Sequence, residues 1–325
     1  MKKDSDDLLN KIVIQKTGDF ETDLRNIAVT LRDNFDYIED ETFVQALDQY
    51  LTAAYADKSE SLETMLTDID QSGDAEFIDR MRQLFDQEPI RAQFETALFI
   101  RKMEDDFSNL RPKMNEKHLA IFSAIDQFKF YFDNGPEIEL QPTKRDYAGL
   151  YRFYAQLLFK GNDWRDSAEN YQQAILWNPY DSSIYYELAH LYQEMNQFGM
   201  SYPTILSALK HSVTCEELAQ GFFLLGAFYA SKEDWEIAYR LYELSQDWQS
   251  TEAVKTVISD LEGQVDKDVL VAMPRAEVLK KLSLNHYPNE DMVAALANYT
   301  DKQSNSELKA ELQEVMAALD RCHDL

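Results

Sequence analysis

Helical periodicity runs through almost the whole chain. Apolar residues recur at spacings of three and four, the pattern of helices that bury one face, and no longer stretch alternates as a half-buried strand does. Ahead of residue 140 the apolar positions predict six helices, around residues 24–31, 43–54, 62–69, 77–85, 94–103 and 119–128. The pattern therefore predicts an all-α protein.

The clearest break in this pattern lies between residues 133 and 144. Gly135, Pro136 and Pro142 interrupt helix there, because glycine and proline are the residues that most strongly end regular elements. We expect residues 1–140 to form an N-terminal α-helical domain.

Between residues 148 and 252 the sequence repeats itself, with a period of 34 residues and then of 37. Aromatic side chains open the units at Tyr151, Tyr185 and Phe222. Three columns contain only small residues, namely Ala155, Ala189 and Gly226, then Ser167, Ser201 and Ala238, then Ala174, Ala208 and Ser245. Since antiparallel helices approach closely only where side chains are small, these columns predict stacked helix pairs.

These columns resemble the tetratricopeptide repeat (TPR) family, whose 34-residue helix–turn–helix unit carries the W-x2-L-G-x2-Y…A-x3-F…P pattern. The resemblance covers three units, residues 148–181, 182–215 and 219–252, inside a domain of residues 141–252. It implies a helical-repeat solenoid, preceded by the N-terminal helical domain and followed by C-terminal capping helices in residues 253–325.

Pro203 departs from the family pattern, because it lies inside the expected second helix of the middle unit. A proline in a helix interior costs about 3 kcal/mol, whereas it is tolerated in the first turn. We expect this helix to begin late, near Ser201, or to bend there.

The C-terminal stretch S-N-S-E-L-K-A-E-L-Q-E-V-M-A-A-L predicts one amphipathic helix. Ser304 and Glu307 have the spacing of a capping box. The apolar stripe consists of Leu308, Leu312, Val315, Met316 and Leu319. Two interpretations remain open: the helix caps the solenoid, or it is a surface for self-association.

The net charge of −27 is spread along the chain. Because nucleic-acid affinity depends on Lys and Arg neutralising phosphates, DNA, RNA and anionic membranes are unfavourable partners. No apolar segment is long enough to span a bilayer, so we expect a soluble, cytoplasmic protein. The only two cysteines, Cys215 and Cys322, offer neither a disulfide framework nor a zinc-binding spacing.

The stretch D-I-D-Q-S-G-D-A-E-F-I-D, residues 68–79, resembles a calcium-binding loop in its spacing of oxygen-bearing side chains. Its candidate ligands are Asp68, Asp70, Ser72, Asp74 and Asp79. Calcium loops prefer a closing glutamate where this chain has Asp79, and Asp74 is well placed to cap the next helix. We therefore predict a polar turn between helices, with a weak cation site as the alternative.

No catalytic or cofactor motif is present in the sequence. The five histidines lack metal-ligand spacing, and there is no nucleophile elbow or glycine-rich phosphate loop. Cys322 and His323 read as a frayed helix end and not as a nucleophile pair. We expect a protein that is not an enzyme and needs no cofactor.

The TPR resemblance implies a partner-binding groove built by the first helix of each unit. The groove residues carried over are Arg152, Gln156, Phe159, Lys160, Tyr186, His190, Gln193, Glu194, Phe223, Ala227 and Ala230. Such a groove is basic at its first unit, mixed at the second and apolar at the third, which suits a segment with an acidic group and an apolar anchor. Alternatively, the chain's own C-terminal segment covers these residues.

Two functions follow as expectations. The first is a protein-interaction scaffold that holds a peptide or a helix of a partner protein in the groove. The second is a regulatory sensor or antagonist of a response regulator, resembling Rap-type proteins that join a helical bundle to TPR repeats. Residues 1–140 carry a net charge of −15, which disfavours a DNA-binding domain at that end.

Overall fold

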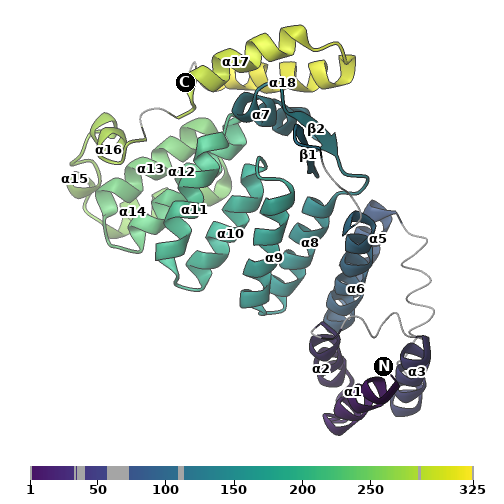
Figure 1. The fold of residues 1–325 in the computed structure, drawn as a ribbon. Coiled ribbons are helices and arrows are strands. Elements are labelled where there is room, and N and C mark those ends of the chain that lie inside the picture. Colours follow the sequence, from purple (N-terminus) through teal and green to yellow (C-terminus); the bar gives the residue numbers. More distant parts are fainter. Residues whose placement is uncertain are drawn as a thin grey trace. The chain divides into compact units, whose positions relative to one another are not determined.

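The computed structural model describes residues 2–32, 34, 41–56, 73–108, 113–284 and 287–323 (Figure 1). Helices dominate them, as the apolar spacing predicted, with two short strands. Their packing divides the chain into two compact units. Unit 1 comprises Met1–Leu110 and Phe153–Asp163, and unit 2 comprises Arg111–Arg152 and Trp164–Leu325.

Unit 1 contains five described helices of the N-terminal part and the second half of α8. They are α1 (Lys2–Ile14), α2 (Phe20–Arg32), α3 (Glu41–Ala54), α5 (Asp74–Phe85), α6 (Pro89–Ser108) and α8 (Tyr147–Lys160). Phe77 of α5 stacks on Phe99 of α6 with ring centroids 3.8 Å apart. Gln93 Nε2 donates to the carbonyl oxygen of Leu157 at 3.0 Å, so the end of α8 is fastened to α6. The sequence pattern did not indicate α1.

Unit 2 contains the remaining helices of the repeat region. They are α9 (Trp164–Trp177), α10 (Ser182–Glu194), α11 (Phe198–His211), α12 (Cys215–Ala230) and α13 (Trp235–Trp248). In the sequence they follow α8 in the order that the repeats predict. Within unit 2, α10 packs on α11, α12 on α13, and α11 on α12.

The turn after the first helix of each repeat has the same geometry in all three repeats. Asn162, Asn196 and Glu233 take left-handed conformations, with φ of 65°, 57° and 62°. The amide of the next residue, at positions 163, 197 and 234, reaches the carbonyl oxygen five residues back at 2.9, 2.7 and 3.1 Å. This bond satisfies a carbonyl that would otherwise lack a partner at the helix end. The left-handed residue is a repeated feature that the sequence comparison missed.

All nine residues of the small columns are buried. At Gly226 a Cβ atom would lie 2.7 Å from the ring of Tyr242, which no real contact tolerates. Ser245 uses its small size differently, because its hydroxyl donates to the carbonyl oxygen of Ala219 at 2.8 Å. The small columns therefore mark the places where helices lie closest.

The expectation that the helix of Pro203 begins late, near Ser201, was wrong, while the alternative of a bend there stays a prediction. Helix α11 begins at Phe198 and runs through the proline. The amides of Met200 and Ser201 both donate to the carbonyl oxygen of Gln197, at 2.9 and 3.1 Å, which closes the first turn ahead of the proline. Gly199, whose carbonyl loses its helical donor to Pro203, is exposed, so water can hydrate that oxygen.

Residues 113–142 form a short β-α-β element where the sequence predicted a helix over 119–128. Strands β1 (Glu116–Leu119) and β2 (Glu139–Pro142) pair in parallel and are joined by α7 (Ala124–Asn134). Ser123 fixes the start of α7 by accepting the amide of Asp126 at 3.1 Å. The expected domain boundary near residue 140 lies inside unit 2.

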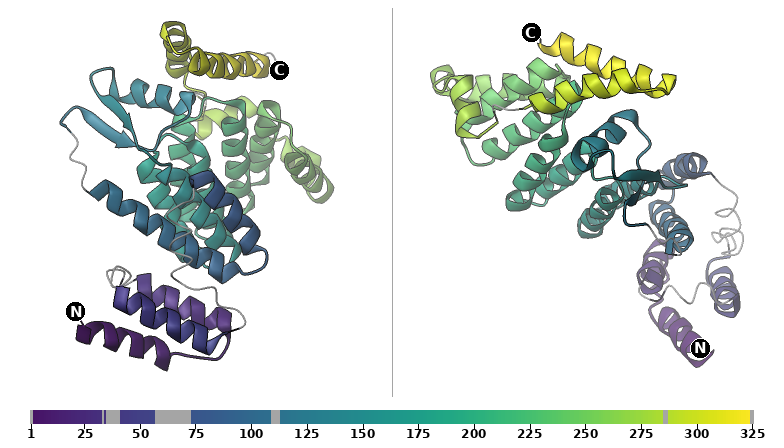
Figure 2. Two further views of the ribbon diagram at one scale, coloured as in Figure 1. Left: turned by 90° about the vertical axis from the view of Figure 1, so that its right-hand side faces the viewer. Right: turned by 45° about the horizontal axis from the view of Figure 1, so that its top comes forward.

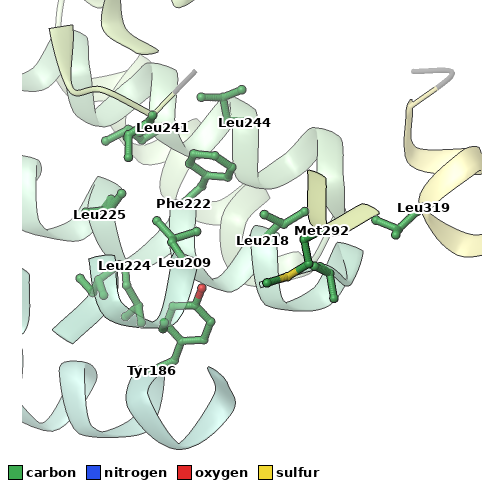
Figure 3. Close-up of a cluster of buried hydrophobic side chains, with 14 of the residues drawn as sticks. Tyr186, Leu209, Leu218, Phe222, Leu224, Leu225, Leu241, Leu244, Met292 and Leu319 are labelled. Atoms are coloured by element: carbon green, nitrogen blue, oxygen red, sulfur yellow. The ribbon is translucent and has the colours of Figure 1, made fainter. Parts of the chain in front are cut away.

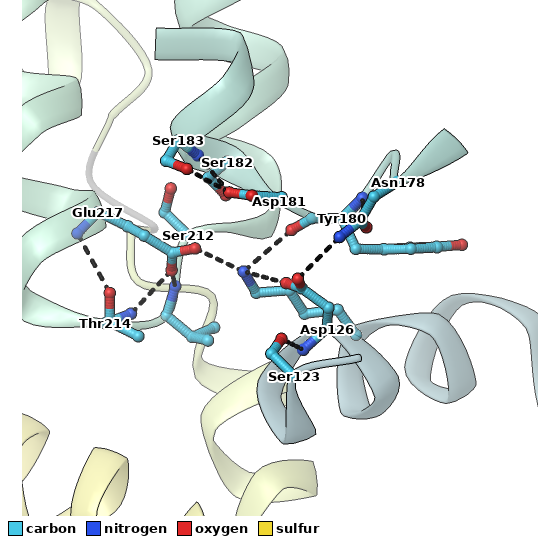
Figure 4. A network of polar contacts seen from close by, with 12 residues as sticks. Ser123, Asp126, Asn178, Tyr180, Asp181, Ser182, Ser183, Ser212, Thr214 and Glu217 are labelled. Atoms are coloured by element: carbon cyan, nitrogen blue, oxygen red, sulfur yellow. Dashed lines mark hydrogen bonds and ion pairs between the residues drawn. The ribbon is translucent and has the colours of Figure 1, made fainter. Parts of the chain in front are cut away.

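Lys129 of α7 is fully buried and connects this element to the repeat region through Glu217 and Tyr180, which Figure 4 labels together with Asp126. Its Nζ lies 2.5 Å from Glu217 Oε1 of α12 and 3.5 Å from Asp126 Oδ1. It also donates to the carbonyl oxygen of Tyr180, between α9 and α10, at 3.1 Å. One ammonium group therefore ties together three segments that are distant in the sequence.

The partners of Lys129 are themselves held in place. Glu217 Oε2 accepts the amides of Val213 and Thr214 at 2.9 and 3.1 Å, and the Thr214 side chain accepts the Glu217 amide in return, a capping box. Burial alone would raise the pKa of Glu217, but Lys129 and these amides hold it below its usual value. Burial would lower the pKa of Lys129, and the carboxylates of Glu217 and Asp126 raise it instead. Both pKa shifts favour the charged form of the Lys129–Glu217 pair.

The C-terminal part consists of α14 (Glu252–Gln264), α15 (Lys267–Leu270), α16 (Arg275–Lys281), α17 (Glu290–Lys302) and α18 (Ser306–His323). The first three cover α13, and α17 and α18 form a hairpin that packs on α7 in every view (Figures 1 and 2). Leu312 and Leu319 of the predicted stripe are buried in the same core as Leu218 and Met292 (Figure 3). The stripe is thus used within unit 2.

Two further sequence expectations were wrong, one about the cap of α18 and one about the cysteines. Asn305, not Ser304, caps α18, because its Oδ1 accepts the amides of Glu307 and Leu308 at 3.0 and 3.3 Å. Cys215 is disulfide-bonded, although the sequence offered no disulfide framework.

Gly226→Leu should destabilise the protein by about 1–3 kcal/mol, because the new side chain would overlap the Tyr242 ring. Urea unfolding measures the change. Gly199→Leu is the control, since nothing lies within 4 Å of a Cβ atom there, and its effect should stay under about 1 kcal/mol. Equal midpoints for both variants would contradict the packing at Gly226.

Lys129→Met should lower the free energy of unfolding by about 3–5 kcal/mol at neutral pH, because it leaves buried carboxylates without a cation. The folded-state pKa of Glu217 is depressed, so its pairing contributes stability above about pH 4 and loses it as the pH falls below that value. The deficit of the variant should therefore shrink in acid. Lys144→Met, at an exposed lysine, should change stability by less than about 0.5 kcal/mol; a Lys129→Met deficit that small would show that the cluster is not needed.

Candidate partner-binding face

The first helices of the repeat units bring a charged cluster together at the start of the expected groove. Arg152 of α8 donates through Nε to Glu187 Oε1 of α10 at 2.9 Å, and a second guanidinium nitrogen bonds the same carboxylate. Its Nη1 lies 3.5 Å from Asp181 Oδ2. The Tyr171 hydroxyl also bonds Glu187, and burial together with that carboxylate raises the pKa of Tyr171.

This cluster corrects the expectation that the groove is basic at its first repeat. Arg152 already has two carboxylate partners within the chain, so its charge is not free to bind an acidic group. With Glu194 included, the face in unit 2 has one arginine against three carboxylates. A basic ligand group fits this balance better than an acidic one.

The next turn of α10 carries the accessible polar side chains. His190 and Glu194 are 51% and 50% exposed, with His190 Nε2 3.5 Å from Glu194 Oε1. Gln193 is half-buried. Its Nε2 donates to the carbonyl oxygen of Leu224 at 3.0 Å, which links α10 to α12. Of the groove residues on α10, His190 and Glu194 are the most exposed.

Tyr186 is not a groove residue, contrary to the sequence expectation. Its side chain is fully buried (Figure 3), and its hydroxyl lies 2.8 Å from Ser212 Oγ. Burial raises the pKa of Tyr186 well above the ordinary value. The ring belongs to the core between α10, α11 and α12, where the absence of a side chain at Gly221 leaves room for the Tyr186 hydroxyl and for Leu209.

The apolar end of the expected groove is half-buried. Phe223 of α12 packs on Tyr242 of α13 with ring centroids 5.4 Å apart. Ala227 and Ala230 are partly accessible on the same helix. These residues offer a small, partly accessible apolar surface.

Three expected groove residues belong to unit 1, namely Gln156, Phe159 and Lys160. Lys160 is exposed, and its Nζ lies 5.9 Å from the centroid of the Phe85 ring. Without these three, the face described in unit 2 consists of Arg152, Asp181, Glu187, His190, Gln193, Glu194, Phe223, Ala227 and Ala230.

The calcium-like loop is only partly described. Asp68, Asp70 and Ser72 lie outside the described residues, while Asp74 and Asp79 are on α5. Gly73 occupies the N-cap position without a side-chain cap, and Asp74 is the first helical residue, so the expected cap by Asp74 was wrong. Within the described part of the chain, no three His, Cys, Asp or Glu side chains are grouped to hold a metal ion.

The histidines have separate surroundings. His211 Nε2 lies 3.0 Å from Asp133 Oδ2, and burial lowers the pKa of His211. His118 is on β1, His286 lies outside the described residues, and the side chains of Cys322 and His323 are also outside them.

None of the helices that the structure describes is long and apolar enough to cross a membrane.

Comparisons with known proteins leave the family open. No family model matches the chain, and no curated protein matches it. A solved structure of BtubC (BKLC) from P. vanneervenii aligns over 82% of this chain and 91% of its own, at 16% identity and a TM-score of 0.30. A similarity this low carries no conclusion about fold or function.

Arg152→Glu should destabilise the protein by about 2 kcal/mol, because it replaces two charge-assisted bonds by a third carboxylate beside Glu187 and Asp181. Urea unfolding at neutral pH measures this loss. Arg165→Glu is the matched control, since Arg165 is 87% exposed in its pair with Glu169 and should cost no more than about 0.5 kcal/mol. Equal small losses would mean that Arg152 is free to bind a partner.

Proposed function

We propose that this protein is an interaction scaffold, in which TPR-like helix pairs hold a segment of another protein against the first-helix face. The observation that carries the proposal is the half-exposed pair His190 and Glu194 on α10, the first helix of the middle pair. Around it, Gln193 and Tyr186 are engaged within the chain, which fixes the backbone that presents the pair. A rigid polar face of this kind suits recognition of a peptide or a helix.

The charge of the face indicates which segment it would take. One arginine faces three carboxylates, and the whole chain carries −27, so an approaching basic segment is attracted both locally and at a distance. A Lys or Arg of the partner would pair with Glu194. Phe223, Ala227 and Ala230 would contact apolar side chains of the same segment.

Repeated local geometry supports the TPR-like assignment. The left-handed turn residue and its amide bond recur at equivalent positions in each pair, with the small residues buried. Stacked units of identical geometry present their first helices in a regular order, which is how repeat proteins make extended binding surfaces.

The test is affinity capture with the full-length chain as bait and two charge-reversal variants. A truncated bait that lacks residues 1–140 is unsuitable for two reasons. It would lack the buried Lys129, and it would deprive Phe153–Asp163 of the other residues of unit 1. Glu194→Lys should reduce capture of the partner by about tenfold or more, and about 0.5 M salt should weaken the wild-type complex. Glu169→Lys, at an exposed residue of α9, is the control and should bind as wild type does.

Capture that is equal for Glu194→Lys and Glu169→Lys would contradict a site on α10. If the protein so captured were a response regulator, the regulatory alternative would replace the scaffold proposal. Thermal melts of both variants that match the wild type would show that a loss of binding is not a loss of folding.

A further inference from the structure

A second polar contact, separate from Lys129, joins α7 to the repeat region. His211 is the last residue of α11, and its Nε2 lies 3.0 Å from Oδ2 of Asp133, in the last turn of α7. Tyr180, in the turn between α9 and α10, places its ring in a T-shaped arrangement with the imidazole, with centroids 5.5 Å apart. Three segments that are distant in the sequence therefore meet at one imidazole ring.

The surroundings of this imidazole favour its neutral form. A carboxylate only accepts hydrogen bonds, so the neutral ring carries its proton on Nε2 and donates it to Asp133. Nδ1 is buried and has no hydrogen-bond partner among the residues that the structure describes. A second proton, on Nδ1, would be a donor buried without an acceptor, which costs free energy.

The charged groups around His211 act in both directions. Asp133 stabilises the protonated ring, whereas Lys129 of α7 and Lys210 of α11 repel it. Burial has the largest effect, because only 14% of the His211 side chain is exposed, and the pKa of His211 is lowered as a result. The neutral ring is therefore the form that fits the folded protein.

We propose that His211 is an acid-sensitive latch, which ties the C-terminal end of α7 to the end of α11 and loosens when the imidazole gains its second proton. In the unfolded chain a histidine gains that proton at about pH 6.5. Since the pKa of His211 is lower in the folded protein, the latch contributes its full stability above about pH 6.5 and loses it as the pH falls from there towards the folded-state pKa.

Loosening this end of α7 would reach the C-terminal hairpin α17–α18. Tyr131 of α7 stacks on Tyr299 of α17, with ring centroids 6.2 Å apart. Asn134 Nδ2, at the end of α7, donates to the Tyr180 hydroxyl at 2.7 Å, so the ring beside His211 is held from the same helix end. The latch thus determines how firmly one end of α7 is held, while Lys129 anchors the middle of the helix.

The first measurement follows the imidazole itself in the full-length protein. Proton–carbon NMR spectra of protein labelled at histidine give a titration curve for each ring, and the curve that is absent from His211→Gln belongs to His211. Its midpoint should lie below about pH 6.5. Asp133→Asn keeps an oxygen acceptor but removes the negative charge, so it should lower this midpoint further and identifies the curve even if His211→Gln does not fold.

Hydrogen exchange tests whether this titration loosens the joint. Between about pH 7.5 and about pH 5, amides of residues 130–134 and 207–211 should lose protection by about threefold or more, after correction for the intrinsic pH dependence of exchange. The amide side chain of His211→Gln can still donate to Asp133 but does not titrate in this range. Its protection should therefore fall less than that of the wild type.

Two comparisons separate His211 from the other titrating groups. Asp126 and Glu217 are present in both proteins, so the difference between the wild type and His211→Gln leaves their titration out. His190→Gln, at a half-exposed histidine of α10, should keep the loss of protection that the wild type shows. A His211 midpoint at or above about pH 6.5, or an equal loss of protection in the wild type and His211→Gln, would overturn the proposal.

Discussion

A buried ammonium group determines how the middle of this chain folds. Lys129 is fully buried, and a charge taken out of water costs several kcal/mol unless charged and polar partners surround it. Its partners come from α12 and from the turn between α9 and α10, so none of the three segments can satisfy the charge alone. The β-α-β element is consequently part of unit 2, although glycine and proline interrupt the helical pattern within it.

The position of Lys129 also depends on the C-terminal hairpin α17–α18. Helix α7 must present Lys129 at a fixed depth, and its first amide is capped by Glu311, which lies 187 positions away in the chain. Ring contacts between Phe128 and Tyr299 hold the same helix from the outside. Segments at both ends of unit 2 thus stabilise one another through α7, and the loss of either would strain the Lys129 cluster.

The sequence predicted the features that depend on local steric contacts, namely the helices and the positions of small residues. Helices appear where apolar residues recur at helical spacing, and residues that had to be small, such as Gly226, are small because a ring lies directly against them. Four-residue strands carry too little pattern to detect, and Leu119, which looked helical, ends β1. The late start expected at Pro203 was wrong because helix continuity depends on whether a freed carbonyl reaches water, which composition does not reveal.

Long-range pairing explains the errors in the candidate face. Arg152 looked like a ligand-binding cation, but its carboxylate partners, Asp181 and Glu187, are supplied by a neighbouring helix and its cap, 29 and 35 positions later. Tyr186 stood on the expected open face, yet the loop carrying Ser212 encloses it. Spacing within one helix predicts which residues share a face, but not which face another segment covers.

The burial of the C-terminal stripe bears on how copies of this chain would meet. Leu312 and Leu319 are committed to the core, so association through them would first require the α17–α18 hairpin to open. Two closed copies would instead approach with a net charge of −27 each, and that repulsion opposes association. The basic segment that we propose as the ligand would meet neither obstacle, because the net charge would attract it and neither His190 nor Glu194 is part of the hairpin core.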